Sequence, residues 1–296
     1  MISKISPAGT KPHTTVPLDY LIVALAAMLQ PVTAQPLDLA GAIVSPLLGL
    51  IGGWFLWSWL RRVPWPGRYA ALLTYALSAI LVHGTALGRP DQQGLLILLL
   101  LIAFAAEWRL WENATTGWSA VSGISWGLAL WVSLYEPLVL LAVVLLVGMI
   151  KAPAKIISEP RRIGWRVMAG IVLLAVLIER RWPGPPGFGP FFARWAQTIG
   201  ELHSISLTNP IWLSWVGGLI LLSPFLIALA FRRRGVPRLF LALLILLFLL
   251  SLWEARWGYF FAFLFVLTIP AQFAVVRQRW LTFGLLLGSL FPMLQF

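Results

Sequence analysis

The sequence predicts an all-α fold, a polytopic integral membrane protein with about ten transmembrane helices and an interfacial helix near the N-terminus. Three observations lead to this fold class. Of the 296 residues, 60% are hydrophobic and only 11% are charged, whereas an average soluble domain has about 25% charged residues. The mean hydropathy is +0.88, and long apolar runs recur along the whole chain. The basic residues collect between alternate runs, as they do in multi-pass membrane proteins.

Each element is an apolar run that charged residues or turn formers bound on both sides. A hydrocarbon core of about 30 Å requires about 20 helical residues, so the shorter runs have uncertain ends, and 137–150 is short enough to be re-entrant. The segment 18–30 is shorter still, and we expect it to form an interfacial or re-entrant helix. The expected spans are 39–60, 69–87, 93–110, 118–135, 137–150, 165–179, 210–231, 238–255, 257–276 and 280–296.

The basic residues predict the topology. Five segments hold 15 of the 22 Lys and Arg residues, and by the positive-inside rule they face the cytoplasm. Both chain ends then lie outside, and we expect one further helix upstream of Met1, because no span precedes this outer N-terminus. The basic segments are 61–68, Arg109, 151–166, 232–238 and 277–279.

Composition also excludes several kinds of site. The chain has no cysteine, which excludes disulfides, thiolate metal sites and thiol nucleophiles. Three histidines leave little for an imidazole metal site. The net charge of +12 is explained by cytoplasmic loops, so we expect the lipid bilayer and not nucleic acid as a partner.

One polar turn carries the first candidate site. The segment HGTALGRPDQQGL at 83–95 joins two expected spans and places Arg89 and Asp91 at the outer bilayer edge. Ionisable residues there are costly and often functional. Asp91 and Gln93 offer oxygen ligands that suit Mg²⁺ or Mn²⁺. The alternative is an ordinary polar turn that Gly and Pro bend.

Two further outer segments contain ionisable residues. Glu201 lies in the long external loop and could bring a second carboxylate to Asp91; the alternative is a solvated surface glutamate. Arg256 lies at the outer end of a span among aromatic residues, where a guanidinium can bind a phosphate bidentately. The alternative there is an Arg256–Glu254 pair that reaches the interface.

Together these places resemble the GT-C class of polytopic glycosyltransferases, and most closely the catalytic subunit of oligosaccharyltransferase and its bacterial membrane relatives. The turn with Gly88, Asp91 and Gln93 is similar to the second acidic metal motif of that family. The segment 198–201, Thr-Ile-Gly-Glu, is similar to its external-loop glutamate motif. Arg256 in EARWGYFFA is similar to the arginine that holds the phosphates of the lipid-linked donor.

The resemblance implies a glycosyltransferase of a bacterial inner membrane that takes a sugar from a polyprenyl-phosphate-linked donor on the outer face, with an unknown acceptor. It implies a divalent cation, Mg²⁺ or Mn²⁺, bound by the catalytic Asp91 and Glu201 and more weakly by Gln93. Arg256 and Arg89 would bind the donor phosphates. The sequence departs from the family at Gln93, where a carboxylate or histidine is usual, and in lacking the first acidic motif. The alternatives are a non-enzymatic transporter or scaffold subunit for lipid-linked sugars, or an inactive fragment of the enzyme.

The resemblance also divides the chain. The segments 7–21 and 35–50 look like the later part of a first external loop that runs into the second span. Residues 1–38 are therefore expected to be the remainder of that loop with its interfacial helix. Residues 39–296 are expected to be the transmembrane helical domain, which contains an external loop at 180–209.

Overall fold

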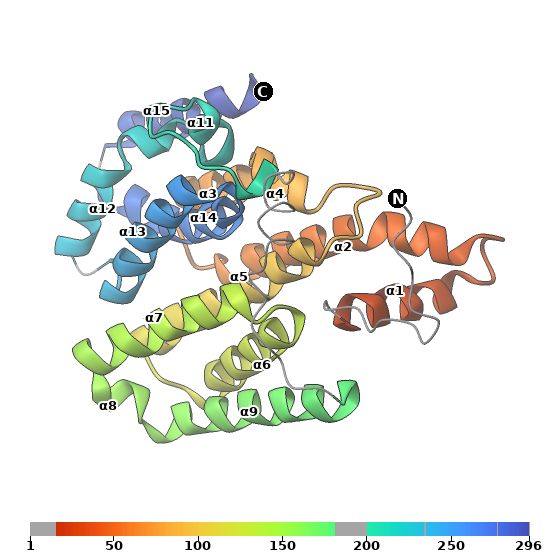
Figure 1. Ribbon diagram of the computed structural model, residues 1–296. Helices are drawn as coiled ribbons and strands as arrows, with labels where there is room; N and C mark the ends of the chain where they lie inside the picture. The colour runs from red at the N-terminus through yellow and green to blue at the C-terminus, as the bar shows by residue number, and fades with distance from the viewer. Residues whose placement is uncertain (1–15, 181–199, 234, 277, 296) are drawn as a thin grey trace.

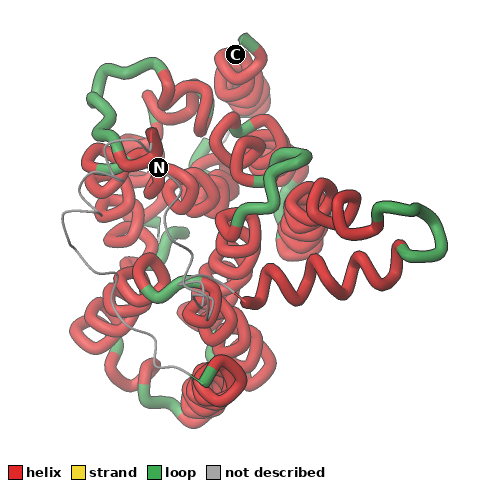
Figure 2. The backbone as a smooth tube through the Cα atoms, turned by 45° about the vertical axis from the view of Figure 1, so that its right-hand side comes forward, coloured by secondary structure: helices red, strands yellow, loops and turns green. Residues whose placement is uncertain are grey.

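The computed structural model describes residues 16–180, 200–233, 235–276 and 278–295. All regular secondary structure in these residues is helical (Figures 1 and 2). This confirms the all-α fold class. The helices are α1 (Val16–Leu29), α2 (Pro36–Trp59), α3 (Trp65–Leu77), α4 (Ala79–Gly84), α5 (Gln92–Glu112), α6 (Thr116–Val132), α7 (Tyr135–Lys151), α8 (Pro153–Ile156), α9 (Glu159–Glu179), η1 (Gly200–Leu202), α11 (Ile211–Val216), η2 (Gly218–Leu221), α12 (Ser223–Arg232), α13 (Arg238–Trp253), η3 (Ala255–Trp257), α14 (Gly258–Ala274), α15 (Arg279–Leu290) and η4 (Phe291–Leu294).

The expectation of about ten membrane spans is wrong, because most of the described helices are too short to cross a membrane. Within the described residues, 3 helices are long and apolar enough to cross a membrane: α2, α5 and the segment Ala255–Ala274. The remaining apolar runs do form helices, but α6 and α7 have 17 residues each and α13 has 16. α9 has 21 residues but begins with a charged segment, EPRRIGWR.

Two expected spans are interrupted by a local change of backbone direction. The run 69–87 breaks at Ser78, which is extended (φ −60°, ψ 110°) between α3 and α4, and its hydroxyl donates to the carbonyl oxygen of Trp215 at 2.6 Å. The run 210–231 breaks at Gly217, whose φ is +75°. A Cβ atom there would lie 2.0 Å from the carbonyl oxygen of Ser289, so this position requires glycine.

The core surrounds α5 and α14, which lie in the middle of the molecule (Figure 1). In both of these candidate spans, 83% of the apolar window is buried inside the protein, against 33% for α2. Phe104 of α5 lies at the centre of an aromatic cluster. Its ring centroid is 5.5 Å from that of Trp126, 6.3 Å from that of Phe240 and 5.8 Å from that of Phe263. The central helices are therefore enclosed by other helices of the same chain.

Small residues bring α6 and α9 into backbone contact. A Cβ atom on Gly123 would lie 2.2 Å from the carbonyl oxygen of Gly164, and one on Gly164 would lie 2.4 Å from that of Ser119. Stripes of small residues allow such close approach between apolar helices. A larger side chain at Gly123 or Gly164 would therefore force the two helices apart.

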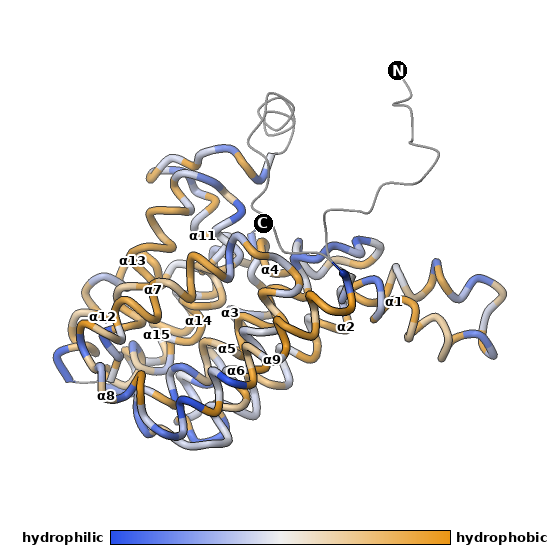
Figure 3. Tube along the Cα trace, turned by 60° about the horizontal axis from the view of Figure 1, so that its bottom comes forward, coloured by the Kyte–Doolittle hydropathy of each residue, from blue (hydrophilic) through white to orange (hydrophobic). Residues whose placement is uncertain are grey.

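Two hydrogen bonds join segments that were expected on the same side of the membrane. At the outer ends, the amide of Gly88 donates to the carbonyl oxygen of Ala42 at 2.9 Å. At the basic ends, Arg233 donates to the carbonyl oxygen of Val275 at 3.2 Å. Figure 3 shows apolar colour along the helices and hydrophilic colour in many of the connecting loops. Which end faces the cytoplasm stays a prediction.

The expected N-terminal interfacial segment is a helix, and it pairs with α2. α1 contacts α2 and forms a hairpin that projects from the rest of the molecule (Figures 1 and 2). Several of its large apolar side chains are exposed, among them Tyr20, Val23 and Met28. An apolar surface on a projecting hairpin is consistent with contact with lipid, and its depth in a membrane remains a prediction.

Candidate functional site

The polar turn before α5 is held by α2. Gly88 has φ +75°, a conformation that glycine adopts without strain. Its amide bonds to α2 at Ala42, and the hydroxyl of Ser45 donates to the carbonyl oxygen of Arg89 at 2.5 Å. Asp91 then caps α5, because its Oδ1 accepts from the amide of Gln93 at 3.3 Å. These bonds fix the directions of Arg89 and Asp91.

Arg89 binds both carboxylates that were expected to act together. Its Nη2 lies 2.6 Å from Oε1 of Glu201 and 3.3 Å from Oδ2 of Asp91. About a third or less of each of the three side chains is exposed. Burial disfavours the charged guanidinium, but the hydrogen bond and charge of Glu201, together with the charge of Asp91, outweigh burial and raise the pKa of Arg89. Arg89 is therefore a fixed positive charge between two carboxylates.

Two aromatic side chains complete this group. The hydroxyl of Tyr259, in α14, donates to Oε1 of Glu201 at 2.9 Å. Nδ1 of His83, in α4, lies 2.8 Å from that hydroxyl and 2.7 Å from Nη1 of Arg89. We call His83, Arg89, Asp91, Glu201 and Tyr259 the Arg89 cluster. It brings together side chains from α4, the turn before α5, η1 and α14.

Glu201 reaches the cluster because its segment is bonded to the turn between α13 and α14. The amide of Ile205 donates to the carbonyl oxygen of Leu252 at 3.1 Å, and the amide of Ala255 donates to that of His203 at 3.0 Å. These two backbone bonds place η1 beside η3. Of the expected motif at 198–201, Thr198 and Ile199 lie outside the described residues, as does most of the expected external loop at 180–209.

Arg256 has a partner that the sequence did not suggest. Its Nη2 donates to Oε1 of Glu136, in the first turn of α7, and the structure records this ion pair in place of the expected alternative with Glu254. Glu136 is fully buried, and its Oε2 accepts from the hydroxyl of Ser133 at 2.5 Å. Among the described residues, Nε of Arg256 is buried without a hydrogen-bond partner. The guanidinium is thus anchored at one nitrogen atom and has unused donors.

The expected metal ligands are only partly assembled. Gln93 is buried, and its Oε1 has no hydrogen-bond partner within the described ranges, so one expected oxygen ligand is unpaired there. Asp91 and Glu201 meet at a guanidinium. Among the described residues, there is no group of three or more His, Asp or Glu side chains that could hold a metal ion. Two carboxylates and one amide oxygen are hard ligands of the type that Mg²⁺ and Mn²⁺ prefer, but they form an incomplete set.

A second buried ion pair lies toward the opposite end of α5. Oε2 of Glu107 accepts from Nη2 of Arg161 at 2.5 Å, and its Oε1 accepts from the hydroxyl of Ser122 at 2.6 Å and from Nε1 of Trp126 at 3.2 Å. Both charged side chains are almost completely buried. The pair connects α5, α6 and α9. Because both oxygen atoms of Glu107 have hydrogen-bond partners, we interpret the pair as a structural element.

The structure thus joins three of the five expected site residues through their side chains. Arg89, Asp91 and Glu201 lie in one cluster, whereas Arg256 pairs with Glu136. Sequence reasoning missed the contacts of Tyr259, Glu136 and His83. A tyrosine in the run WGYFFAFLF, and a glutamate at the start of an apolar run, were the only signals available.

Comparison with known proteins reveals similarity at the level of the fold. No protein-family model matches the sequence, and neither does any curated protein sequence. Solved structures of the Archaeoglobus fulgidus oligosaccharyltransferase do match. One, tethered with an acceptor peptide, gives a TM-score of 0.60 at 16% identity and covers 96% of this chain and 46% of that chain. A second, in complex with Zn and sulfate, gives 0.60 at 16% identity and covers 97% and 44%.

A third structure, of the archaeal oligosaccharyltransferase AglB from the same organism in complex with an inhibitory peptide and a dolichol-phosphate, gives a TM-score of 0.60 at 14% identity. It covers 97% of this chain and 47% of that chain. This chain therefore spans less than half the length of these proteins. At this level of identity the likeness establishes a shared helical fold, and function has to be argued from the site.

Proposed function

We propose that this chain forms the donor-binding part of a membrane glycosyltransferase, which takes a sugar from a polyprenyl-phosphate-linked donor on the outer face of the membrane. The observation that carries the proposal is the Arg89 cluster. Asp91 and Glu201, 110 positions apart in the printed sequence, meet at one guanidinium in a fold similar to that of an oligosaccharyltransferase. Transfer from such a donor leaves a phosphate group whose growing charge needs cationic partners.

Arg89 and Arg256 are the proposed partners of the donor phosphates. Each contacts its carboxylates through Nη2 alone, Arg89 with two of them and Arg256 with one, and a guanidinium has five donors. Arg89 is part exposed and therefore accessible to a phosphate. The side chain of Arg256 is 20% exposed, and its buried Nε has no partner among the residues that the structure describes, so it too has binding capacity left. A phosphate would match the planar geometry of either side chain.

A divalent cation is proposed at Asp91 and Glu201, with Oε1 of Gln93 as a further oxygen ligand. The unpaired buried oxygen of Gln93 supports this set. Because the set is incomplete, the donor phosphate or water would supply the remaining ligands. The cation would neutralise charge on the leaving phosphate. Arg89 already supplies a positive charge at the same carboxylates, and the protein groups alone orient Asp91 and Glu201.

The surroundings follow from the same proposal. The chain would lie in the plasma membrane of a bacterium as a multi-pass protein, with the Arg89 cluster at the outer surface and the lipid bilayer as its main partner. The solved neighbours are described with dolichol-phosphate and with peptides. A polyprenyl-linked donor and a peptide acceptor are therefore the first substrates to test. No feature of the sequence calls for nucleic acid.

A second candidate is a non-enzymatic subunit that binds lipid-linked sugars. One observation favours it: in the described part of the chain, both proposed phosphate-binding arginines are already ion-paired with carboxylates. Such a protein would bind the donor without consuming it. A single assay that measures both binding and consumption of the donor therefore separates the two candidates.

The test is donor consumption by protein reconstituted in nanodiscs, with a polyprenyl-linked sugar, a peptide acceptor and Mn²⁺. We expect Asp91→Asn and Glu201→Gln each to reduce the rate by at least about 10-fold, since each removes a charge from the cluster. The matched control is Asp38→Asn, an exposed carboxylate in the first turn of α2, outside the cluster. Asp38→Asn should act at the parental rate.

Two results would contradict the proposal. Donor that binds but is never consumed, with and without Mn²⁺, would leave the binding subunit as the better description. Equal rates in Asp91→Asn, Glu201→Gln and Asp38→Asn would remove the Arg89 cluster from the reaction. Thermal unfolding of each variant shows whether the protein remains folded.

A further inference from the structure

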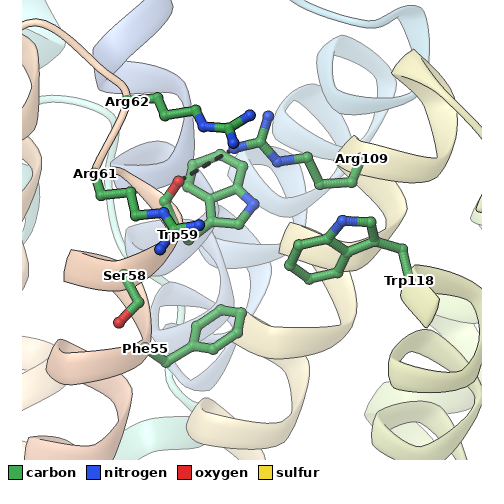
Figure 4. A pocket seen from close by; sticks show the side chains of 7 residues that line it. All are labelled: Phe55, Ser58, Trp59, Arg61, Arg62, Arg109 and Trp118. Carbon is green, nitrogen blue, oxygen red and sulfur yellow. Dashed lines mark hydrogen bonds between the residues drawn. The ribbon is translucent and has the colours of Figure 1, made fainter.

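A cavity of about 450 Å³ lies at the opposite end of the molecule from the Arg89 cluster. Its lining comes from the end of α2, the turn after it, the end of α5 and the start of α6 (Figure 4). In the part of the chain that the structure describes, α2 and α5 are two of the three helices long and apolar enough to cross a membrane. The ends of such helices coincide with the lipid headgroup region. The lining residues are Phe55, Ser58, Trp59, Arg61, Arg62, Arg109 and Trp118.

Three arginine side chains give the cavity its charge. The side chains of Arg61, Arg62 and Arg109 all line the cavity (Figure 4). Within the described chain, Arg109 pairs with the exposed Glu112 at 3.2 Å, whereas the guanidinium groups of Arg61 and Arg62 have no ion pair or hydrogen bond. Among the described residues, two arginines without a carboxylate partner beside a third leave the lining with a net positive charge. Like charges repel each other, and a bound anion would relieve this repulsion.

One of these arginines is already oriented. Nη2 of Arg109 donates to the carbonyl oxygen of Trp59 at 3.2 Å, and its guanidinium carbon lies 5.1 Å from the centroid of the Trp59 ring. Such contacts hold a guanidinium in place before a ligand arrives and reduce the entropy that binding costs. Arg61 and Arg62 line the same cavity and are exposed, so their guanidinium groups are accessible to an anion.

The remaining wall is apolar and aromatic. Phe55 and Trp118 face the cavity from α2 and α6 (Figure 4), and Trp59 is buried beneath Arg109. Tryptophan beside arginine at a helix end is typical of the membrane interface. A ligand that matches this lining has a phosphate group next to an apolar group. A phospholipid has this arrangement, because its phosphate lies beside the glycerol that carries the acyl chains.

We propose that this cavity binds the phosphate group of an anionic membrane lipid, on the side of the membrane that carries the basic loops. The proposal goes beyond the glycosyltransferase function and does not depend on it. A soluble phosphate ester has the same charged group, so the test uses one arm for each source.

The lipid arm measures retention of phosphatidylglycerol and of phosphatidylcholine by purified protein, with native mass spectrometry over a lipid titration. We expect the parent to prefer phosphatidylglycerol by at least about 10-fold, the effect of one charge-assisted contact. The double variant Arg61→Gln/Arg62→Gln should lose this preference. The matched control, Arg232→Gln/Arg233→Gln, removes an adjacent pair of arginines from another basic loop, outside the cavity, and should keep it.

A third variant tests the cavity itself. Ser58→Phe keeps every arginine but fills space in the lining, and it should also lower the preference for phosphatidylglycerol. This variant decides the matter if Arg61→Gln/Arg62→Gln fails to fold, which thermal unfolding shows. Equal lipid preference in Ser58→Phe and the parent, or in the two double-arginine variants, would overturn the proposal.

The soluble arm titrates inorganic phosphate onto the parent in phosphatidylcholine nanodiscs, with the shift of the unfolding temperature as the readout. We expect millimolar phosphate to cause no saturable shift of the unfolding temperature in the parent. A shift caused by binding in this cavity would be recognised by its loss in Arg61→Gln/Arg62→Gln. If such a shift occurs and the parent shows no preference for phosphatidylglycerol, the ligand is a soluble phosphate and the lipid proposal is wrong.

Discussion

Nη2 of Arg89 lies 2.6 Å from Oε1 of Glu201, although 112 positions separate the two residues in the chain. The same nitrogen atom contacts Asp91 at 3.3 Å. The two carboxylates expected to share a divalent cation therefore share a guanidinium, with Tyr259 as a further donor to Glu201. A cation at this place has to compete with Arg89, and this competition leads to the first prediction.

Removal of Arg89 should strengthen divalent-cation binding, while removal of either carboxylate should weaken it. Arg89→Gln takes away a competing positive charge, and we expect the dissociation constant for Mn²⁺ to fall by about 10-fold or more. Asp91→Asn and Glu201→Gln should raise it by at least as much. Electron paramagnetic resonance of free Mn²⁺ measures all three. Parental affinity in both carboxylate variants would exclude the shared site.

Arg256 should contribute to donor binding through its planar guanidinium. Arg256→Lys keeps the charge but loses the bidentate geometry, and we expect donor affinity to fall by roughly 10- to 150-fold, as about 1.5–3 kcal/mol predicts. Glu254→Gln should leave donor affinity nearly unchanged, because the ion pair of Arg256 is with Glu136. Binding of a polyprenyl-linked sugar in nanodiscs is the measurement. Unchanged affinity in both Arg256→Lys and Arg256→Ala would make Arg256 purely structural.

The buried Glu107–Arg161 pair should be essential for stability. Glu107→Gln leaves an uncompensated buried guanidinium and is expected to lower the free energy of unfolding by about 3–5 kcal/mol. The control is Glu112→Gln, five positions along the same helix, where the pair with Arg109 is solvent exposed and worth about 0–1 kcal/mol. Reversible unfolding in mixed micelles compares the two. A similar, small loss in both variants would contradict the prediction.

The α6–α9 contact should tolerate no side chain at Gly164. In Gly164→Ala the Cβ atom would lie 2.4 Å from the carbonyl oxygen of Ser119, so the helices must separate, at a cost of about 1–3 kcal/mol. Gly170 lies in the same helix with nothing within 4 Å of its Cβ position, and Gly170→Ala should instead stabilise the protein by about 0.5–1 kcal/mol. Thermal unfolding of both variants measures the difference, and equal midpoints would count against the close contact.

The two ends of the molecule should face different compartments. The chain has no native cysteine, so Leu87→Cys and Gly235→Cys each introduce a single thiol at an exposed position. By the positive-inside rule, a membrane-impermeant maleimide added to intact cells should label position 87 and spare position 235. Lysed cells provide the control, since both positions should then react. The reverse pattern would invert the topology and place the Arg89 cluster inside.

The sequence alone determined the helical fold class and most of the helix positions. Helix formation in apolar runs depends on hydrophobicity and on local signals such as the cap at Asp91, and both can be read within a few residues. α5 was expected at 93–110 and runs from Gln92 to Glu112. The sequence also suggested that Glu201 could reach Asp91, because few other carboxylates occur in the expected outer loops. It placed Arg89 with Arg256 instead, as phosphate-binding residues that the family resemblance implies.

The tertiary structure decided the helix lengths and the partners of the charged residues. Ser78 and Gly217 interrupt apolar runs because neighbouring segments occupy the adjacent space, which hydropathy does not report. Arg256 pairs with Glu136 across 120 positions, and Tyr259 with Glu201 across 58. Which residues become partners depends on which helix ends pack together. Packing depends on contacts between segments along the whole chain. The composition of a single segment therefore does not predict these partners.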